Sequence, residues 1–305
     1  MKGNSLKSVL LALLVTCAGF FLTVSSASGG MEAHSGMHDG GNAGSGHHAA
    51  EPEIVAHLTT QPQHVTVGVP TTVKFTIDDA EGKPVQGLTV MHARYLHVVI
   101  VSQDFSVFAH VHPRDFERLT PEVLKSGRFF VRFTFPRAGR YAVGLDFAVK
   151  GRHFGRHFIV NVAGGPEMTP ARKDFAREER VDGLDVGFST KPSRLVANRK
   201  AVLTYIFRKD GRPVTDLEPW LEAPMHLAIV SSDLKYFLHV HGEVPGMEHA
   251  GHEEGHMHMH MSVPSEFGPE IEVPVVFPGK GLYEVYGQAG YKGKVILTKF
   301  MVDVQ

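Results

Sequence analysis

Histidine is the residue type that stands out in this chain. Its 305 residues include 20 histidines and 11 methionines, while the net charge is only −1. One group has the spacing His97-x12-His110-x-His112, with valine-rich segments on both sides of a Ser-Gln-Asp-Phe-Ser turn. Imidazole nitrogens are common protein ligands of copper and zinc. The first question is therefore whether these three rings can reach one ion.

A β-hairpin would bring the three rings together. A turn centred near Asp104 places His97 opposite His110 or His112 on the neighbouring strand. The latter two share a face of their strand because side chains alternate with a period of two, and opposite Cβ atoms lie about 5 Å apart. We expect a three-histidine site with an open coordination position for copper or zinc, with Asp104 as a turn residue. The alternative is that the histidines hydrogen-bond the backbone and serve the fold.

A second copy of the pattern follows at an offset of 129 residues. Residues 82–112 align with residues 211–241 without a gap, and 13 of the 31 positions are identical. The equivalent histidines are His226, His239 and His241. Downstream, the sequence Phe-Pro-x-x-Gly-x-Tyr recurs at an offset of 142, so the second copy carries 13 extra residues. The chain is an internal duplication, and the predicted site occurs in both copies.

The two sites need not be equivalent. Met225 precedes His226 and could add a thioether ligand that favours Cu(I), whereas the first copy has Leu96 there. Met91 and His92 lie near the first site in the sequence. They could supply further ligands or line a pocket.

The extra residues of the second copy are another candidate for metal binding. Residues 247–261 contain five histidines and four methionines. The candidate ligands there are His249, His252, His256, His258, His260, Met257 and Met259. Imidazole and thioether together suit copper in either oxidation state, or silver. An His-Glu-x-x-His match occurs in this segment, but its glycines argue against the helix that metalloprotease chemistry needs. We expect a flexible loop over residues 242–262 with low selectivity; the alternative is a solvated linker.

The N-terminus has the pattern of an export signal. Lys2 and Lys7 precede an apolar run and a small, polar segment, so residues 1–29 are expected to be a signal peptide. The apolar run is too short for a stable transmembrane span, and the location expected is the periplasm or the cell surface. Cys17 leaves lipid anchoring as a less favoured alternative; after cleavage no cysteine remains, which excludes disulfides and thiolate ligands. Residues 30–52, rich in glycine, histidine and methionine, are expected to be disordered.

The remaining chain is predicted to be all-β. Each copy contains short β-rich segments separated by glycine and proline turns, which is typical of immunoglobulin-like or cupredoxin-like sandwiches. We therefore expect β-sandwich modules over residues 53–164 and 183–305, joined by a linker over 165–182. The helix candidate is Pro170–Arg180. The balanced charge gives no basic surface, so nucleic acid is not an expected partner.

Two short motifs carry a resemblance to a known family. The chain resembles the exported bacterial β-sandwich domains of the YtkA-like type over about two thirds of its mature length. The resemblance lies in Gly-Lys-Pro-Val85, its counterpart Gly-Arg-Pro-Val214, and the Pro-x-x-Gly-x-Tyr corner. The block 226–241 is similar to a segment of secreted proteins often associated with copper handling. The resemblance implies an immunoglobulin-like fold and an envelope location, and it implies no catalytic activity.

Three functions are compatible with these features. The favoured hypothesis is an exported, non-enzymatic protein that binds copper, or zinc, for storage, delivery or resistance, with other envelope copper-handling proteins as partners. The second is a structural or interaction module with incidental histidines, and the third is a copper redox enzyme. The sequence has neither a Gly-x-Ser-x-Gly elbow nor a phosphate-binding glycine-rich loop.

Overall fold

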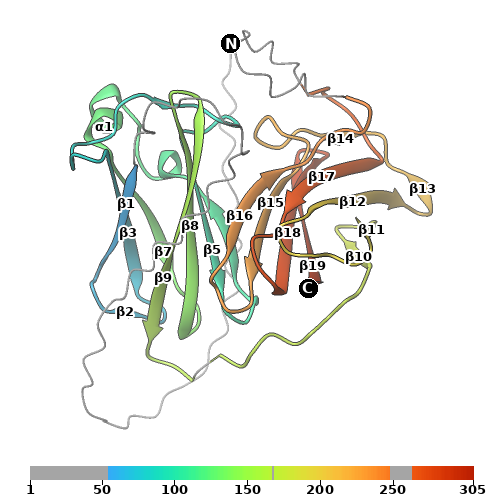
Figure 1. The fold of residues 1–305 in the computed structure, drawn as a ribbon, viewed down its shortest axis with the longest axis horizontal. Helices are drawn as coiled ribbons and strands as arrows, with labels where there is room; N and C mark the ends of the chain where they lie inside the picture. Colours follow the sequence, from blue (N-terminus) through green and yellow to red (C-terminus); the bar gives the residue numbers. More distant parts are fainter. Residues whose placement is uncertain (1–53, 167, 248–262) are drawn as a thin grey trace. The chain divides into compact units, whose positions relative to one another are not determined.

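The computed structural model describes residues 54–166, 168–247 and 263–305, which are mostly β-strand (Figure 1). The predicted signal peptide, the N-terminal tail and all seven of the predicted loop ligands lie outside these residues. The strands group into two modules whose main strands repeat in the same order, as the duplication predicts.

The first module is a sandwich of two sheets. One sheet has the order β1-β3-β7, and the other has the order β2-β9-β8-β5-β6 with β4 beside β8. Their bounds are β1 (Val55–Gln61), β2 (Val65–Thr66), β3 (Pro70–Asp78), β4 (Leu88–Thr89), β5 (Leu96–Ser102), β6 (Phe108–Val111), β7 (Arg128–Thr134), β8 (Gly139–Val149) and β9 (Arg152–Ala163). Alternate residues of β3, such as Val73, Phe75 and Ile77, are buried in the core between the sheets.

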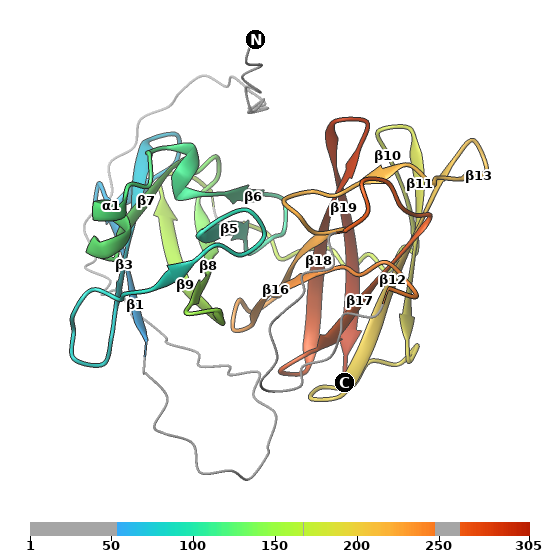
Figure 2. The ribbon, with the colours of Figure 1, turned by 90° about the horizontal axis from the view of Figure 1, so that it is seen from above.

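The second module repeats this arrangement, and Figure 2 shows its two sheets facing each other. One sheet has the order β10-β11-β12-β13 with β17 beside β12, and the other has β14-β18-β15-β16 with β19 beside β18. Their bounds are β10 (Glu178–Val181), β11 (Leu184–Lys191), β12 (Lys200–Lys209), β13 (Arg212–Pro213), β14 (Leu217–Glu218), β15 (His226–Ser231), β16 (Phe237–His241), β17 (Glu270–Val276), β18 (Gly281–Tyr291) and β19 (Lys294–Val304).

A buried tyrosine closes the same corner in both modules. Tyr141 donates a hydrogen bond from its hydroxyl to the carbonyl oxygen of Arg137 at 2.9 Å, and Tyr283 donates to that of Gly279 at 2.7 Å. Such tyrosine corners, with the hydroxyl bonded a few residues upstream, are a feature of immunoglobulin-like sandwiches. The predicted fold class, tandem immunoglobulin-like β-sandwiches, is confirmed.

The prediction of a helix at Pro170–Arg180 was wrong. The end of this segment is strand β10, which forms a hairpin with β11 through Asp182 and Gly183, both with positive φ. This Asp-Gly turn suits the twist of a hairpin, and the pairing draws part of the predicted linker into the second module. The helices among the described residues are η1 (Pro113–Asp115) and α1 (Pro121–Ser126). No helix in the described part of the chain is long and apolar enough to cross a membrane.

A third apolar cluster joins the two modules. It contains Val99 and Val101 of β5 together with Ala228 and Val230 of β15, all almost fully buried. These residues lie on the faces of their strands that point away from each module's own core, because strand side chains alternate. The sheet that contains β5 and the sheet that contains β15 therefore pack against each other through their outer faces.

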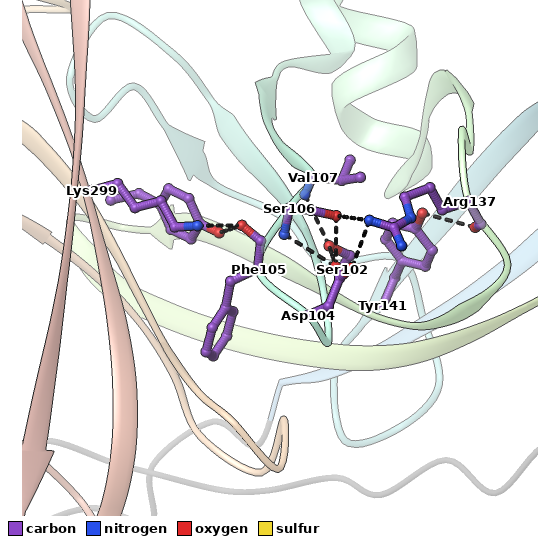
Figure 3. Close-up of polar contacts among 9 residues, drawn as sticks. Ser102, Asp104, Phe105, Ser106, Val107, Arg137, Tyr141 and Lys299 are labelled. Atoms are coloured by element: carbon purple, nitrogen blue, oxygen red, sulfur yellow. Dashed lines mark hydrogen bonds and ion pairs between the residues drawn. The ribbon is translucent and has the colours of Figure 1, made fainter. Parts of the chain in front are cut away.

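The turn between β5 and β6 anchors this contact (Figure 3). Ser102 donates to Asp104 Oδ1 at 2.7 Å, which confirms that Asp104 is a turn residue, and Phe105 at the tip has a φ of 59° and is 2% exposed. The Phe105 carbonyl oxygen accepts hydrogen bonds from Tyr286 Oη at 2.7 Å and Lys299 Nζ at 2.8 Å, both in the second module. The hairpin that carries the first histidine group is thus tied to the other sandwich.

Candidate metal centre

The hairpin register brings the predicted histidines together. In the first module Val98 pairs with Val111, which places His97 opposite His112; in the second module His226 pairs directly with His241. His110 lies two residues before His112, and His239 two residues before His241, so each pair shares one face of its strand. This agrees with the pairing expected from the turn position.

The first-module histidines form a compact group of ligand atoms. One ring nitrogen from each of His97, His110 and His112 lies within 4.8 Å of the others. His97 Nδ1 is 3.1 Å from His110 Nε2, and His112 Nε2 is buried with no hydrogen-bond partner among the described residues. Two nitrogens bound to one tetrahedral ion at about 2.05 Å would lie roughly 3.3 Å apart. The observed spacing therefore fits a shared metal ion.

The second nitrogen of each ring is held by an acceptor. The three contacts are His97 Nε2 to Met91 O at 3.1 Å, His110 Nδ1 to Gln288 Oε1 at 2.7 Å, and His112 Nδ1 to Asp115 Oδ2 at 3.1 Å. Such outer contacts fix the ring orientation and the tautomer of metal-binding histidines. They leave His97 Nδ1, His110 Nε2 and His112 Nε2 as the nitrogens available for a metal.

Two unprotonated ring nitrogens, His97 Nδ1 and His110 Nε2, face each other in the first module. A carbonyl oxygen only accepts, so His97 carries its proton on Nε2 and presents a lone pair at Nδ1. His110 donates from Nδ1 to Gln288 Oε1, so its Nε2 also carries a lone pair. This lone pair faces that of His97 Nδ1, and the two nitrogens are 3.1 Å apart. Two lone pairs repel at this distance, so the gap suits a proton or a metal ion. In the second module, His226 Nδ1 and His239 Nε2 face each other in the same way at 3.4 Å.

The two histidine groups form one cluster between the modules. The ring centroids of His97 and His239 are 5.0 Å apart, and those of His97 and His226 are 5.6 Å apart. Two further groups of ligand atoms within 4.8 Å combine both modules. They are His92, His226 and His241, and His97, His226 and His239. The second-module trio thus shares its space with first-module rings, which the sequence did not indicate.

Burial keeps most of these rings neutral. Burial, reinforced by the neighbouring His239 ring, lowers the pKa of His97 to about 3 and that of His92 to about 4. For the same reason the pKa values of His110, His226 and His241 lie well below the ordinary value. A neutral imidazole has the lone pair that a metal requires. At neutral pH these rings can therefore bind a cation without first losing a proton to solvent.

Asp146 is the buried carboxylate beside the cluster. Its Oδ2 accepts a hydrogen bond from His239 Nδ1 at 2.8 Å, and its Oδ1 contacts His153 Nε2. Burial alone would raise the pKa of Asp146, but the two histidines outweigh it and hold that pKa well below its usual range. Asp146 aligns with Gln288 in the repeat, so each module supplies one polar acceptor to a histidine of the other.

The chain matches the family described as Domain of unknown function (DUF8832) over residues 54–164 and 179–305. It belongs to this family. The two matched segments correspond to the two sandwich modules.

The chain is similar to several solved structures at low identity and low TM-score. The Escherichia coli adhesin FdeC is 11% identical with a TM-score of 0.23, covering 82% of this chain and 64% of that one. Domains 4 and 5 of the S-layer protein SbsC are 11% identical with a TM-score of 0.21, covering 84% and 99%. Invasin, a bacterial integrin-binding protein, is 12% identical with a TM-score of 0.19, covering 82% and 40%. No curated protein matches the sequence.

The predicted ligands fall into three sets: those in the cluster, those outside the described residues, and Met225. The six hairpin histidines join the cluster, whereas His249, His252, His256, His258, His260, Met257 and Met259 lie outside the described residues. Met225 does not join it: this side chain is fully buried in the core of the second module, next to Gly287. The reason is local, since neighbouring residues of a strand point to opposite faces and His226 occupies the outer one.

Three residues of the centre were missed by the sequence analysis. Asp115, Asp146 and Gln288 each hold a histidine ring, and none was singled out from the sequence. A signal existed for two of them, because Asp146 and Gln288 are polar residues at equivalent repeat positions in strands of buried apolar residues. Asp115 lies in η1, and no repeated pattern pointed to it.

Proposed function

We propose that this protein binds copper through the histidine cluster between its two modules, as an exported protein that stores, delivers or detoxifies the metal. The observation that carries the proposal is the geometry of His97, His110 and His112. Each ring directs one nitrogen to a common space and has its other nitrogen bonded to an acceptor. A histidine that served only the fold would have no need of a free, buried nitrogen such as His112 Nε2.

The choice of copper rests on the donor set. The groups consist of imidazole nitrogens alone, which suit copper and zinc far better than calcium or magnesium. Among divalent first-row ions, Cu(II) binds a given site of this kind most tightly. The methionine residues of the segment 247–261 add thioether donors that suit Cu(I). Zinc is the competing ion in the test.

The role proposed is binding and not catalysis. His97 is 1% exposed and His112 is 5% exposed, which leaves little access for an organic substrate. Export and a YtkA-like relationship belong to the same proposal and rest on the N-terminal pattern and the short motifs of the sequence.

The test is competitive titration of the full chain without its signal peptide, using Cu(I), Cu(II) and Zn(II) against chelators of known affinity. His112→Ala should weaken copper binding more than about 100-fold, beyond the loss usual for an outer contact. This variant should fold, because the partner of His112, Asp115, is 41% exposed and can bind water instead. A matched control is His57→Ala, which removes an exposed histidine of the same module.

The outcome separates metal binding from a structural role. Unchanged copper affinity in a folded His112→Ala protein would overturn the proposal. The same variant should show a circular dichroism spectrum like that of His57→Ala. If the histidines only support the fold, the loss will appear in the urea midpoint and not in the copper affinity.

A further inference from the structure

We infer that the centre holds a second ion of the same class, bound across the two modules by His92, His226 and His241. This inference rests on the proposed function, because it assumes that the first-module trio takes copper. It assigns a ligand role to His92, which contributes from the turn before β5. The second ion would bind the first module to the second.

The ligand geometry supports a site distinct from the first trio. Ring nitrogens of His92, His226 and His241 lie within 4.8 Å of one another, and none of the three belongs to the His97, His110 and His112 group. His241 Nε2 is buried and has no hydrogen-bond partner in the described parts of the chain. The His226 ring donates from Nε2 to the carbonyl oxygen of Leu221 at 3.3 Å, which leaves Nδ1 for a metal.

A further ring nitrogen, that of His239, lies close to His226 and shares a group of ligand atoms with His97 and His226. His239 Nε2 is 3.4 Å from His226 Nδ1, close to the roughly 3.3 Å between two ligands of one tetrahedral ion. The other nitrogen of His239 is held by Asp146 at 2.8 Å. Two rings of this second site, His226 and His241, come from the second module and one, His92, from the first. The first trio has one module's rings only, so the two sites differ in what they connect.

The turn that carries His92 is built to hold the ring over His241. His92 and Ala93 have φ values of 49° and 61°, and the ring centroids of His92 and His241 are 3.7 Å apart. The Ala93 amide donates to Glu222 Oε2 at 3.0 Å, so the turn is fastened to the equivalent turn of the second module. The placement of His92 therefore depends on an intermodule contact, as a bridging ligand requires.

The experiment measures the copper that the protein keeps after dialysis against a competing chelator. The background is the full chain without its signal peptide, with the five histidines of the segment 247–261 changed to serine, so that copper bound by them does not enter the count. The changed positions are His249, His252, His256, His258 and His260. In this background His92→Asn is compared with His57→Asn. Asparagine tolerates the left-handed conformation of residue 92, so the turn should survive.

Two tightly held ions are expected in the background protein and in His57→Asn, and one in His92→Asn. Cu(II) electron paramagnetic resonance should show magnetic coupling that His92→Asn removes. Retention of a single ion by the background protein, or of both ions by His92→Asn, would overturn the second site while leaving the proposed function intact. Retention of no ion would overturn the proposed function as well.

Discussion

The contact between Gly144 and Phe237 offers a direct test of how the modules dock. Gly144 lies on β8 of the first module, and a Cβ atom built on it would overlap the ring of Phe237 from β16 of the second. Gly144→Ala should therefore force the ring, and β16 with it, away from the first module. Because His239 follows Phe237 by two residues on the same face, the histidine cluster should be disturbed as well.

The size of the effect follows from two opposing terms. Overpacking a filled contact costs about 1–3 kcal/mol. When Phe237→Ala removes the ring, alanine at position 144 should instead be about 0.5–1 kcal/mol better than glycine within a strand. The coupling energy between the two positions is then about 1.5–4 kcal/mol, well above the roughly 0.5 kcal/mol found for independent sites.

The assay is urea unfolding of the four proteins of this double-mutant cycle, followed by the fluorescence of Trp220, the single tryptophan. Gly155→Ala is the matched control, because an added Cβ there meets only Asp146 Oδ1, at 3.9 Å. Gly144→Ala should lower the free energy of unfolding more than Gly155→Ala does, and only when the Phe237 ring is present. If either expectation fails, the facing sheets of the two modules do not pack as described. The histidines of the two modules would then not form a shared cluster.

Two further predictions concern the surroundings of the cluster. Asp115→Ala removes the acceptor of His112 Nδ1 and should weaken copper binding about 10–100-fold in the chelator titration. Asp115→Asn keeps an acceptor oxygen and should lose less affinity. If Asp115→Ala binds copper as tightly as the parent protein, Asp115 does not have this role. Burial raises the pKa of Glu284 from 4.5 to about 7, with Lys299 opposing and Asp174 and Glu179 adding to the rise. The folded protein therefore binds a proton that the unfolded chain releases between these pH values, so stability should fall by about 3 kcal/mol as pH rises through this window. Glu284→Gln should raise the urea midpoint at pH 8 and change it much less at pH 5; an equal change at both pH values would refute this origin.

The sequence alone was enough for the features that depend on neighbours along the chain. The repeat was visible as identical residues at constant offsets, and the placing of His97 opposite His110 or His112 followed from the turn, because a hairpin's register is set by its loop. The structure selects His112. The same alternation rule should have excluded Met225, which adjoins His226 and therefore faces the core. The error lay in weighing the chemistry of a thioether above the period of a strand.

Only the tertiary structure could decide how the two histidine groups relate. Gln288 holds a ring of the first module and Asp146 a ring of the second, and no local pattern predicts which outer faces of two sandwiches will meet. That choice depends on the fit of surfaces built from distant segments, such as the space that Gly144 leaves for Phe237. The sequence alone determined that each module presents three histidines on one face of a sheet. The packing of those faces against each other decided that the six rings form one centre.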